Sequence, residues 1–145
     1  MVSVQPQRLL DIPLGLYVHW PWCVRKCPYC DFNSHRSPAV LPEDRYVDAL
    51  LAELDRRAET VEGRTVETIF IGGGTPSLMS GDAVRRVMDG ICARIDLAPD
   101  AEVTLEANPG ASDEAKFEAF RRAGVNRLSL GIQSFSPFAD IHYNN

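Results

Sequence analysis

The sequence has no long apolar run and no excess of basic residues. None of its 145 residues belongs to a stretch of the roughly 20 apolar residues that cross a bilayer. With 15 Lys and Arg against 20 Asp and Glu, the net charge is −5, which argues against nucleic acid or anionic membranes as main partners. Residues 1–13 lack the apolar core and the cleavage site of a signal peptide. We therefore expect a cytoplasmic protein with no transmembrane segment and no nucleic-acid partner.

Cysteine is scarce as well, but three of the four cysteines lie together. Cys23, Cys27 and Cys30 follow a short apolar run, while Cys92 is distant in the sequence. In a reducing compartment such a cluster is more often a metal site than a disulfide. Three thiolates can hold three irons of a four-iron cluster and leave the fourth iron open. The same thiols with His35 could instead hold zinc, or they could be idle.

Strand and helix patterns alternate along the chain. Strands are expected over residues 14–19, 66–71, 101–107 and 126–130, with helices over residues 43–61 and 81–95 and a third helix capped by Ser112. Cys92 lies on the apolar stripe of the second helix, where we expect it to be buried as a small hydrophobic residue. The regular alternation predicts an α/β fold with a parallel sheet and right-handed crossovers. Because a closed eight-stranded barrel takes about 250 residues, four strands make an open sheet or half of a barrel.

The carboxyl ends of the predicted strands carry the unusual residues. Ligands bind at this edge of parallel sheets. The cysteine loop, Gly72-Gly73-Gly74-Thr75, Glu106 and Gln133 should meet there. Glycines would let a ligand lie against the backbone, and a carboxylate facing a pocket could hold a ribose hydroxyl or an ammonium group. Taken singly, each of these features is also compatible with an ordinary turn or a solvated side chain. His19 on the first strand is expected to be packed or hydrogen-bonded rather than to be a ligand.

Four motifs then point to a known family. They are Y-V-H-W-P-W-C-V-R-K-C-P-Y-C-D-F-N-S, I-F-I-G-G-G-T-P-S, L-E-A-N-P-G and L-G-I-Q-S-F, in this order over residues 14–135. The chain resembles the radical S-adenosylmethionine (SAM) proteins of the coproporphyrinogen dehydrogenase group, and within it the HemW-type heme chaperones. The resemblance implies the N-terminal part of a radical SAM core, a half TIM-type barrel over residues 14–145, after a short arm at residues 1–13.

The resemblance also implies cofactors and their contacts. A [4Fe–4S] cluster would be bound by Cys23, Cys27 and Cys30, and SAM would chelate the open iron through its amino and carboxylate groups. In the family, reductive cleavage of SAM gives a 5′-deoxyadenosyl radical. The positions that match the family's SAM contacts are Tyr17, the backbone around Tyr29, Gly73, Gly74, Thr75, Glu106 and Gln133.

One departure from the family pattern separates two branches. The coproporphyrinogen dehydrogenases carry a further cysteine just beyond the third ligand and a longer N-terminal extension. This chain has Asp31-Phe32 after Cys30 and only a short arm. The difference favours the heme chaperones, which bind heme and transfer it to acceptor proteins, over an oxygen-independent coproporphyrinogen III oxidase. A third possibility is an inactive fragment or a small zinc-binding module.

Overall fold

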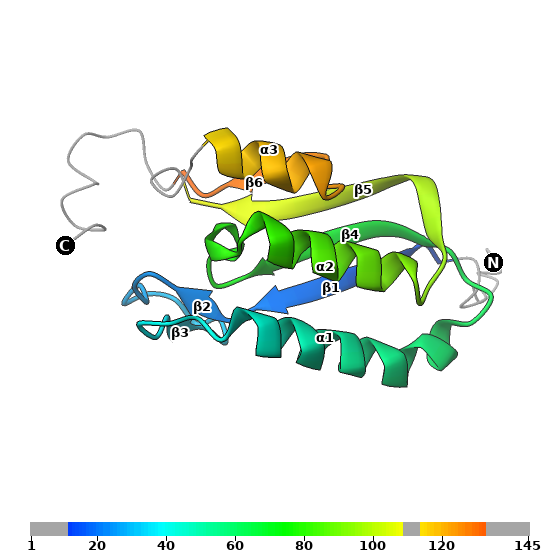
Figure 1. Ribbon diagram of the computed structural model, residues 1–145, viewed down its shortest axis with the longest axis horizontal. Coiled ribbons are helices and arrows are strands. Elements are labelled where there is room, and N and C mark those ends of the chain that lie inside the picture. Colours follow the sequence, from blue (N-terminus) through cyan, green and yellow to red (C-terminus); the bar gives the residue numbers. More distant parts are fainter. Residues whose placement is uncertain (1–11, 109–113, 133–145) are drawn as a thin grey trace, which may run out of the picture.

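A four-stranded parallel sheet is the centre of the fold. The computed structural model describes residues 12–108 and 114–132. Strands β1 (Leu14–Trp20), β4 (Val66–Gly73), β5 (Leu97–Ala107) and β6 (Arg127–Leu130) lie in the order β1-β4-β5-β6 (Figure 1). Every neighbouring pair is parallel. The predicted α/β class with a parallel βα repeat is confirmed.

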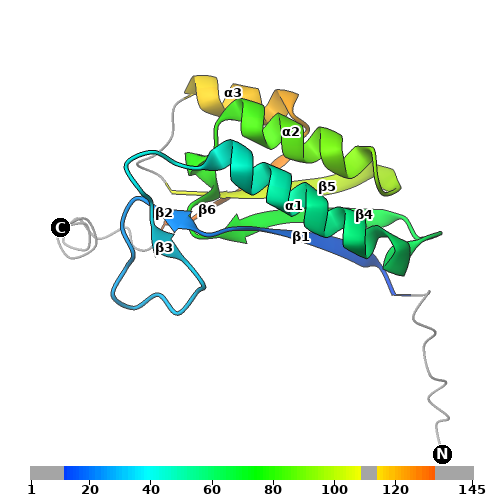
Figure 2. The ribbon, with the colours of Figure 1, turned by 60° about the horizontal axis from the view of Figure 1, so that its bottom comes forward.

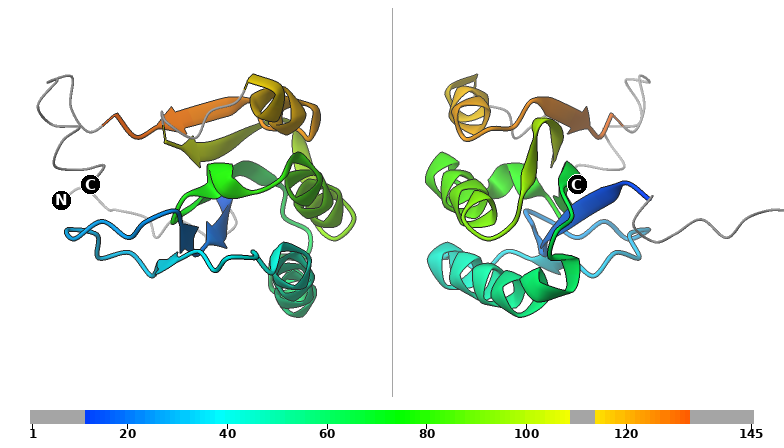
Figure 3. Two further views of the ribbon diagram at one scale, coloured as in Figure 1. Left: turned by 60° about the vertical axis from the view of Figure 1, so that its left-hand side comes forward. Right: turned by 90° about the vertical axis from the view of Figure 1, so that its right-hand side faces the viewer.

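The α-helices of the described residues lie on one face of this sheet. Helices α1 (Glu43–Ala58), α2 (Gly81–Cys92) and α3 (Glu114–Arg122) run side by side across it (Figure 2). The end-on views of Figure 3 show the same layering, and among the described residues no element covers the opposite, inner face of the sheet. The 3₁₀ turns η2 (Glu59–Val61) and η3 (Pro76–Leu78) belong to the connections. Over residues 12–108 and 114–132, no helix has the length and apolar character to span a membrane.

Alternation along the strands sorts side chains between the two faces. On β4, Ile69 and Ile71 are buried toward the helices, whereas Thr68 and Phe70 are exposed on the inner face. This is the period of two that a strand imposes. The buried positions of the strands join those of α2 in one core, in which each fully buried Ile, Leu or Val contributes about 1.5–3 kcal/mol relative to an exposed one. Because one alternate set of strand side chains is buried in the core, only the other set lies on the inner face.

Polar contacts fix α1 against α2. The Arg86 guanidinium reaches Asp44 at 2.7 Å and Asp48 at 2.6 Å. Ser80 caps α2 by accepting a hydrogen bond from the Ala83 N–H at 3.0 Å, as expected for a serine at this position. The Arg86 ion pairs therefore link α1 to α2, while the Ser80 cap stabilises the start of α2 itself.

Several element ends differ from the sequence predictions, and Ser112, the predicted cap of the third helix, lies outside the described residues. β5 begins at Leu97 rather than residue 101, because Leu97 pairs with Val66 across a register shift in the sheet. α2 ends at Cys92 rather than continuing to residue 95. The prediction that Cys92 is buried is wrong: its side chain is exposed, since it lies at the last turn of the helix, just off the buried stripe that includes Met88 and Ile91.

Candidate cofactor site at the carboxyl edge of the sheet

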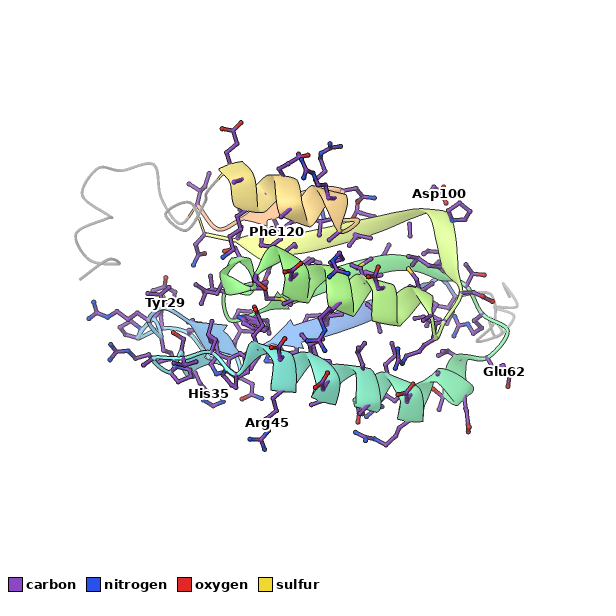
Figure 4. The ribbon with its side chains drawn as sticks, in the orientation of Figure 1. Tyr29, His35, Arg45, Glu62, Asp100 and Phe120 are labelled. Carbon is purple, nitrogen blue, oxygen red and sulfur yellow. The ribbon has the colours of Figure 1, made fainter. Side chains whose placement is uncertain are left out.

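The cysteine loop extends from the carboxyl end of β1. A short parallel pair, β2 (Trp22–Cys23) and β3 (His35–Arg36), closes its base (Figure 1). The His35 N–H donates to the Pro21 carbonyl at 2.7 Å, and the Ser37 N–H donates to the Cys23 carbonyl at 2.8 Å. Tyr29 lies in the exposed part of the loop, apart from His35 at its base (Figure 4). The sequence did not predict this second small sheet.

The three thiols share the loop but do not converge. Cys23 is buried, whereas Cys27 and Cys30 are half-buried. The Cys30 Sγ lies 3.7 Å from the Ser34 Oγ, and the Cys30 N–H donates to the Cys27 carbonyl at 3.1 Å. Within the described part of the chain, no three His, Cys, Asp or Glu side chains gather closely enough to hold a metal ion. The assignment of metal ligands, whether for an iron–sulfur cluster or for zinc with His35, therefore stays a prediction.

The glycine turn after β4 packs directly against the base of the cysteine loop. The Gly74 N–H donates to the Trp20 carbonyl at 2.6 Å and the Thr75 N–H to the Trp22 carbonyl at 2.8 Å. A Cβ on Gly74 would lie 2.6 Å from the Trp22 carbonyl oxygen and 3.0 Å from the Cys23 Sγ. Only a glycine permits so close an approach. The structure thus brings this part of the predicted site together with Cys23.

Glu106 joins the same edge from β5. Its Oε2 accepts a hydrogen bond from the Gly73 N–H at 3.2 Å. A Cβ on Gly72 would lie 3.0 Å from that oxygen, so the absence of a side chain there makes room for the carboxylate. Glu106, Gly73 and Gly74 are therefore neighbours, as the parallel topology predicted. Gln133, the remaining predicted contact, lies outside the described residues.

Tyr17 faces the inner side of the sheet below this edge. It is 55% exposed and stacks on Phe70, with ring centroids 6.3 Å apart. Its hydroxyl lies 2.8 Å from the His19 Nδ1. Burial raises the pKa of the Tyr17 phenol, and the negative charge of Glu106 raises it further. Tyr17 therefore stays neutral and is close enough to Glu106 to respond to its charge.

Several residues at the edge were not predicted as part of the site. Ser34 is fully buried beside Cys30, and the Lys26 ammonium donates to its carbonyl at 3.0 Å. The rings of Trp20, Trp22 and Tyr46 pack edge to face behind the loop. No spacing rule singles these residues out. His19 did carry a signal, because it shares a strand face with Tyr17, and the expectation that it is hydrogen-bonded is confirmed.

Comparison with known proteins decides the family. The model of the radical SAM superfamily matches residues 17–144, almost the whole chain. The chain belongs to the radical SAM superfamily. This membership implies a [4Fe–4S] cluster and SAM as cofactors.

Among the relatives within the superfamily are heme chaperones of the HemW type and a mitochondrial protein. The chain is 58% identical over 124 residues to the heme chaperone HemW of Escherichia coli, which covers 86% of this chain and 33% of that protein. It is 44% identical over 128 residues to HemW of Mycobacterium tuberculosis, with the same coverage. It is also 44% identical over 120 residues to the mitochondrial radical S-adenosyl methionine domain-containing protein 1 of Bos taurus, covering 83% of this chain and 27% of that protein.

A solved structure shares the fold. The chain superimposes on coproporphyrinogen III oxidase (HemN) from Escherichia coli, described as a radical SAM enzyme, with a TM-score of 0.83 and 33% identity. The match covers 91% of this chain and 30% of HemN. The chain spans about a third of the length of the HemW proteins it matches. The predicted fold class, part of a radical SAM barrel built from parallel βα repeats, is therefore confirmed.

Proposed function

We propose that this chain forms part of a HemW-like heme chaperone that binds a [4Fe–4S] cluster through Cys23, Cys27 and Cys30 and binds SAM beside it. The observation that carries the proposal is the packing of the glycine turn, with Glu106, against the base of the cysteine loop. Cluster site and SAM site would then share one edge. The 58% identity to HemW of Escherichia coli supports the chaperone branch.

The donor set fits such a cluster chemically. Thiolates are the usual ligands of iron–sulfur clusters, and all three belong to one loop whose ends are hydrogen-bonded together. Three protein ligands leave one iron open for the amino and carboxylate groups of SAM. When bound, the cluster would supply the electron for the reductive chemistry of the superfamily. The chain's own groups would bind and orient SAM.

The individual contacts are those that the family resemblance implies, and the geometry of the edge supports part of the set. The N–H groups of Gly73, Gly74 and Thr75 already donate to Glu106, Trp20 and Trp22, so this turn would contact SAM through its carbonyl groups. The carboxylate of Glu106 would hold an ammonium group or a ribose hydroxyl, and Tyr17 would contact SAM from the inner face. The backbone around Tyr29 and the amide of Gln133 complete the proposed set of SAM contacts.

Heme and a heme-acceptor protein would be the further partners of the whole protein. The cytoplasmic location stays a prediction.

Anaerobic reconstitution tests the cluster. After incubation with iron and sulfide, we expect a brown protein whose reduced-state EPR signal changes on addition of SAM. A Cys27→Ala variant should lose most of its iron, because two thiolates do not replace three. The matched control is Cys92→Ala, which removes an exposed thiol outside the loop and should keep the iron content of the wild type. A colourless protein with one zinc per chain, or full iron in Cys27→Ala, would contradict the proposal.

An oxygen-independent coproporphyrinogen III oxidase is the second candidate. The structural match to HemN favours it. Asp31 and Phe32 after Cys30 disfavour it, since the oxidases carry an additional cysteine there. Assays of heme binding and of coproporphyrinogen III decarboxylation distinguish the two candidates.

A further inference from the structure

His19 uses both ring nitrogens to connect separate parts of the candidate site. Its Nδ1 lies 2.8 Å from the Tyr17 hydroxyl on the same strand. Its Nε2 lies 2.8 Å from the carbonyl oxygen of Asn33, in the part of the cysteine loop that returns after Cys30. The ring also lies against the glycine turn, since a Cβ on Gly73 would be 2.7 Å from both Cε1 and Nδ1. One half-buried imidazole thus contacts three parts of the edge.

The chemistry of the partners fixes the direction of both hydrogen bonds. A backbone carbonyl can only accept, so the Nε2 of His19 carries the hydrogen and donates to Asn33. In the neutral imidazole, Nδ1 is then an acceptor, and the Tyr17 hydroxyl donates to it. Burial and the charge of Glu106 raise the pKa of Tyr17, which keeps its proton available for this bond.

This arrangement orients the Tyr17 oxygen. Because the hydroxyl proton is directed to His19, the remaining lone pairs of the oxygen can only accept hydrogen bonds from a ligand. A histidine that merely filled space on β1 would not need a partner on the cysteine loop. The second bond, to Asn33, holds the returning segment of the loop against the end of the strand.

We infer that His19 is a positioning residue that orients the Tyr17 hydroxyl as an acceptor for SAM and, through Asn33, fixes the cysteine loop that binds the cluster. The inference rests on the proposed function. It assigns to His19 two separable effects, one on SAM affinity and one on cluster retention. Neither effect requires His19 to touch the iron.

Two substitutions separate the two bonds. The amide of Gln can place an N–H near the position of Nε2, so His19→Gln should keep the bond to Asn33 and lose the acceptor for Tyr17. The shorter amide of Asn reaches the position of Nδ1, so His19→Asn should do the reverse. Each variant of the full chain is reconstituted anaerobically, and its iron content and its Kd for SAM are measured. We expect His19→Gln to keep its iron and bind SAM about 5-fold more weakly, the factor carried by one ordinary hydrogen bond.

His19→Asn should show the opposite profile. We expect it to lose iron faster than wild type when challenged with a chelator, while the molecules that retain a cluster bind SAM with nearly unchanged affinity. A double-mutant cycle then tests the route through Tyr17. In a Tyr17→Phe background, His19→Gln should cause no additional loss of SAM affinity, because the hydroxyl it orients is already absent.

The outcomes distinguish this inference from the proposed function. A wild-type chain that takes up no iron would overturn both. A wild type that loads normally, with both His19 variants equal to it in iron retention and SAM affinity, would overturn the role of His19 alone. Additive losses in the Tyr17→Phe cycle would show that His19 does not act through the Tyr17 hydroxyl.

Discussion

Gly73 is subject to two constraints at once. Its φ of +115° lies where residues with a side chain are strained, and a Cβ would be 2.7 Å from both the His19 ring and the Trp20 carbonyl oxygen. A flexible side chain could turn aside, but the Trp20 carbonyl belongs to β1 and cannot. The position therefore requires glycine for its conformation and for its space.

Substitution separates the two constraints. Gly73→Ala should destabilise the chain by about 2–4 kcal/mol, the sum of backbone strain and crowding. Gly63→Ala is the matched control, because Gly63 also has a positive φ, +75°, but a Cβ there would meet nothing within 4 Å. It should cost only about 1 kcal/mol. Urea unfolding followed by circular dichroism measures both, and equal losses would show that crowding at Gly73 is unimportant.

At the scale of elements, Tyr46 connects α1 to the end of β1. Its hydroxyl donates to the His19 carbonyl at 2.7 Å, and its ring packs against Trp22 with centroids 4.7 Å apart. Burial raises the pKa of the Tyr46 phenol, and the neighbouring Tyr17 raises it further. The folded chain therefore holds the Tyr46 proton more tightly than the unfolded chain does.

This difference predicts a pH dependence of stability. Since the folded state binds more protons once the pH passes the unfolded value of about 10, the free energy of unfolding should fall as the pH rises through that region. Tyr46→Phe should cost about 1 kcal/mol at pH 8, by loss of the hydrogen bond to His19, and should lose less stability than wild type between pH 8 and pH 10.5. Parallel pH profiles of the two proteins would contradict the assignment to Tyr46.

For the molecule as a whole, one core predicts one unfolding transition. The buried residues of the sheet and helices form a single cluster that includes Trp20, which is fully buried. Tryptophan fluorescence and far-UV circular dichroism should therefore report the same urea midpoint for the metal-free chain. Separate midpoints would mean that the aromatic end of β1 unfolds independently of the helices.

The fold was largely predictable because its signal is periodic. Alternating strand and helix patterns predicted the parallel sheet, whereas the assignment to the N-terminal part of a barrel stays a prediction from the family resemblance. The predictions were wrong at the ends of strands and helices, because contacts with distant parts of the chain decide where an element begins or stops. Leu97 extends β5 because it pairs with Val66, and Cys92 is exposed because α2 stops there. Neither fact is encoded in the local pattern.

The sequence predicted where the candidate site lies, but not the hydrogen bonds within it. Parallel topology alone places the cysteine loop, Gly73 and Glu106 at one edge, and the structure brings these parts together. The hydrogen bonds from His19 to Tyr17 and Asn33 depend on how the loop folds back, which no spacing rule specifies. The same holds for the burial of Ser34 beside Cys30.

The β2–β3 pair has a consequence for how the cysteine loop is closed. By pairing Cys23 with Arg36, it holds the two ends of the cysteine loop together, so the backbone itself meets part of the entropy cost of closing the loop. Zinc-finger-type domains fold only with their metal. In this chain the pairing of β2 with β3 uses backbone groups rather than thiolates, so we expect a cluster destroyed by oxygen to leave the base of the loop closed.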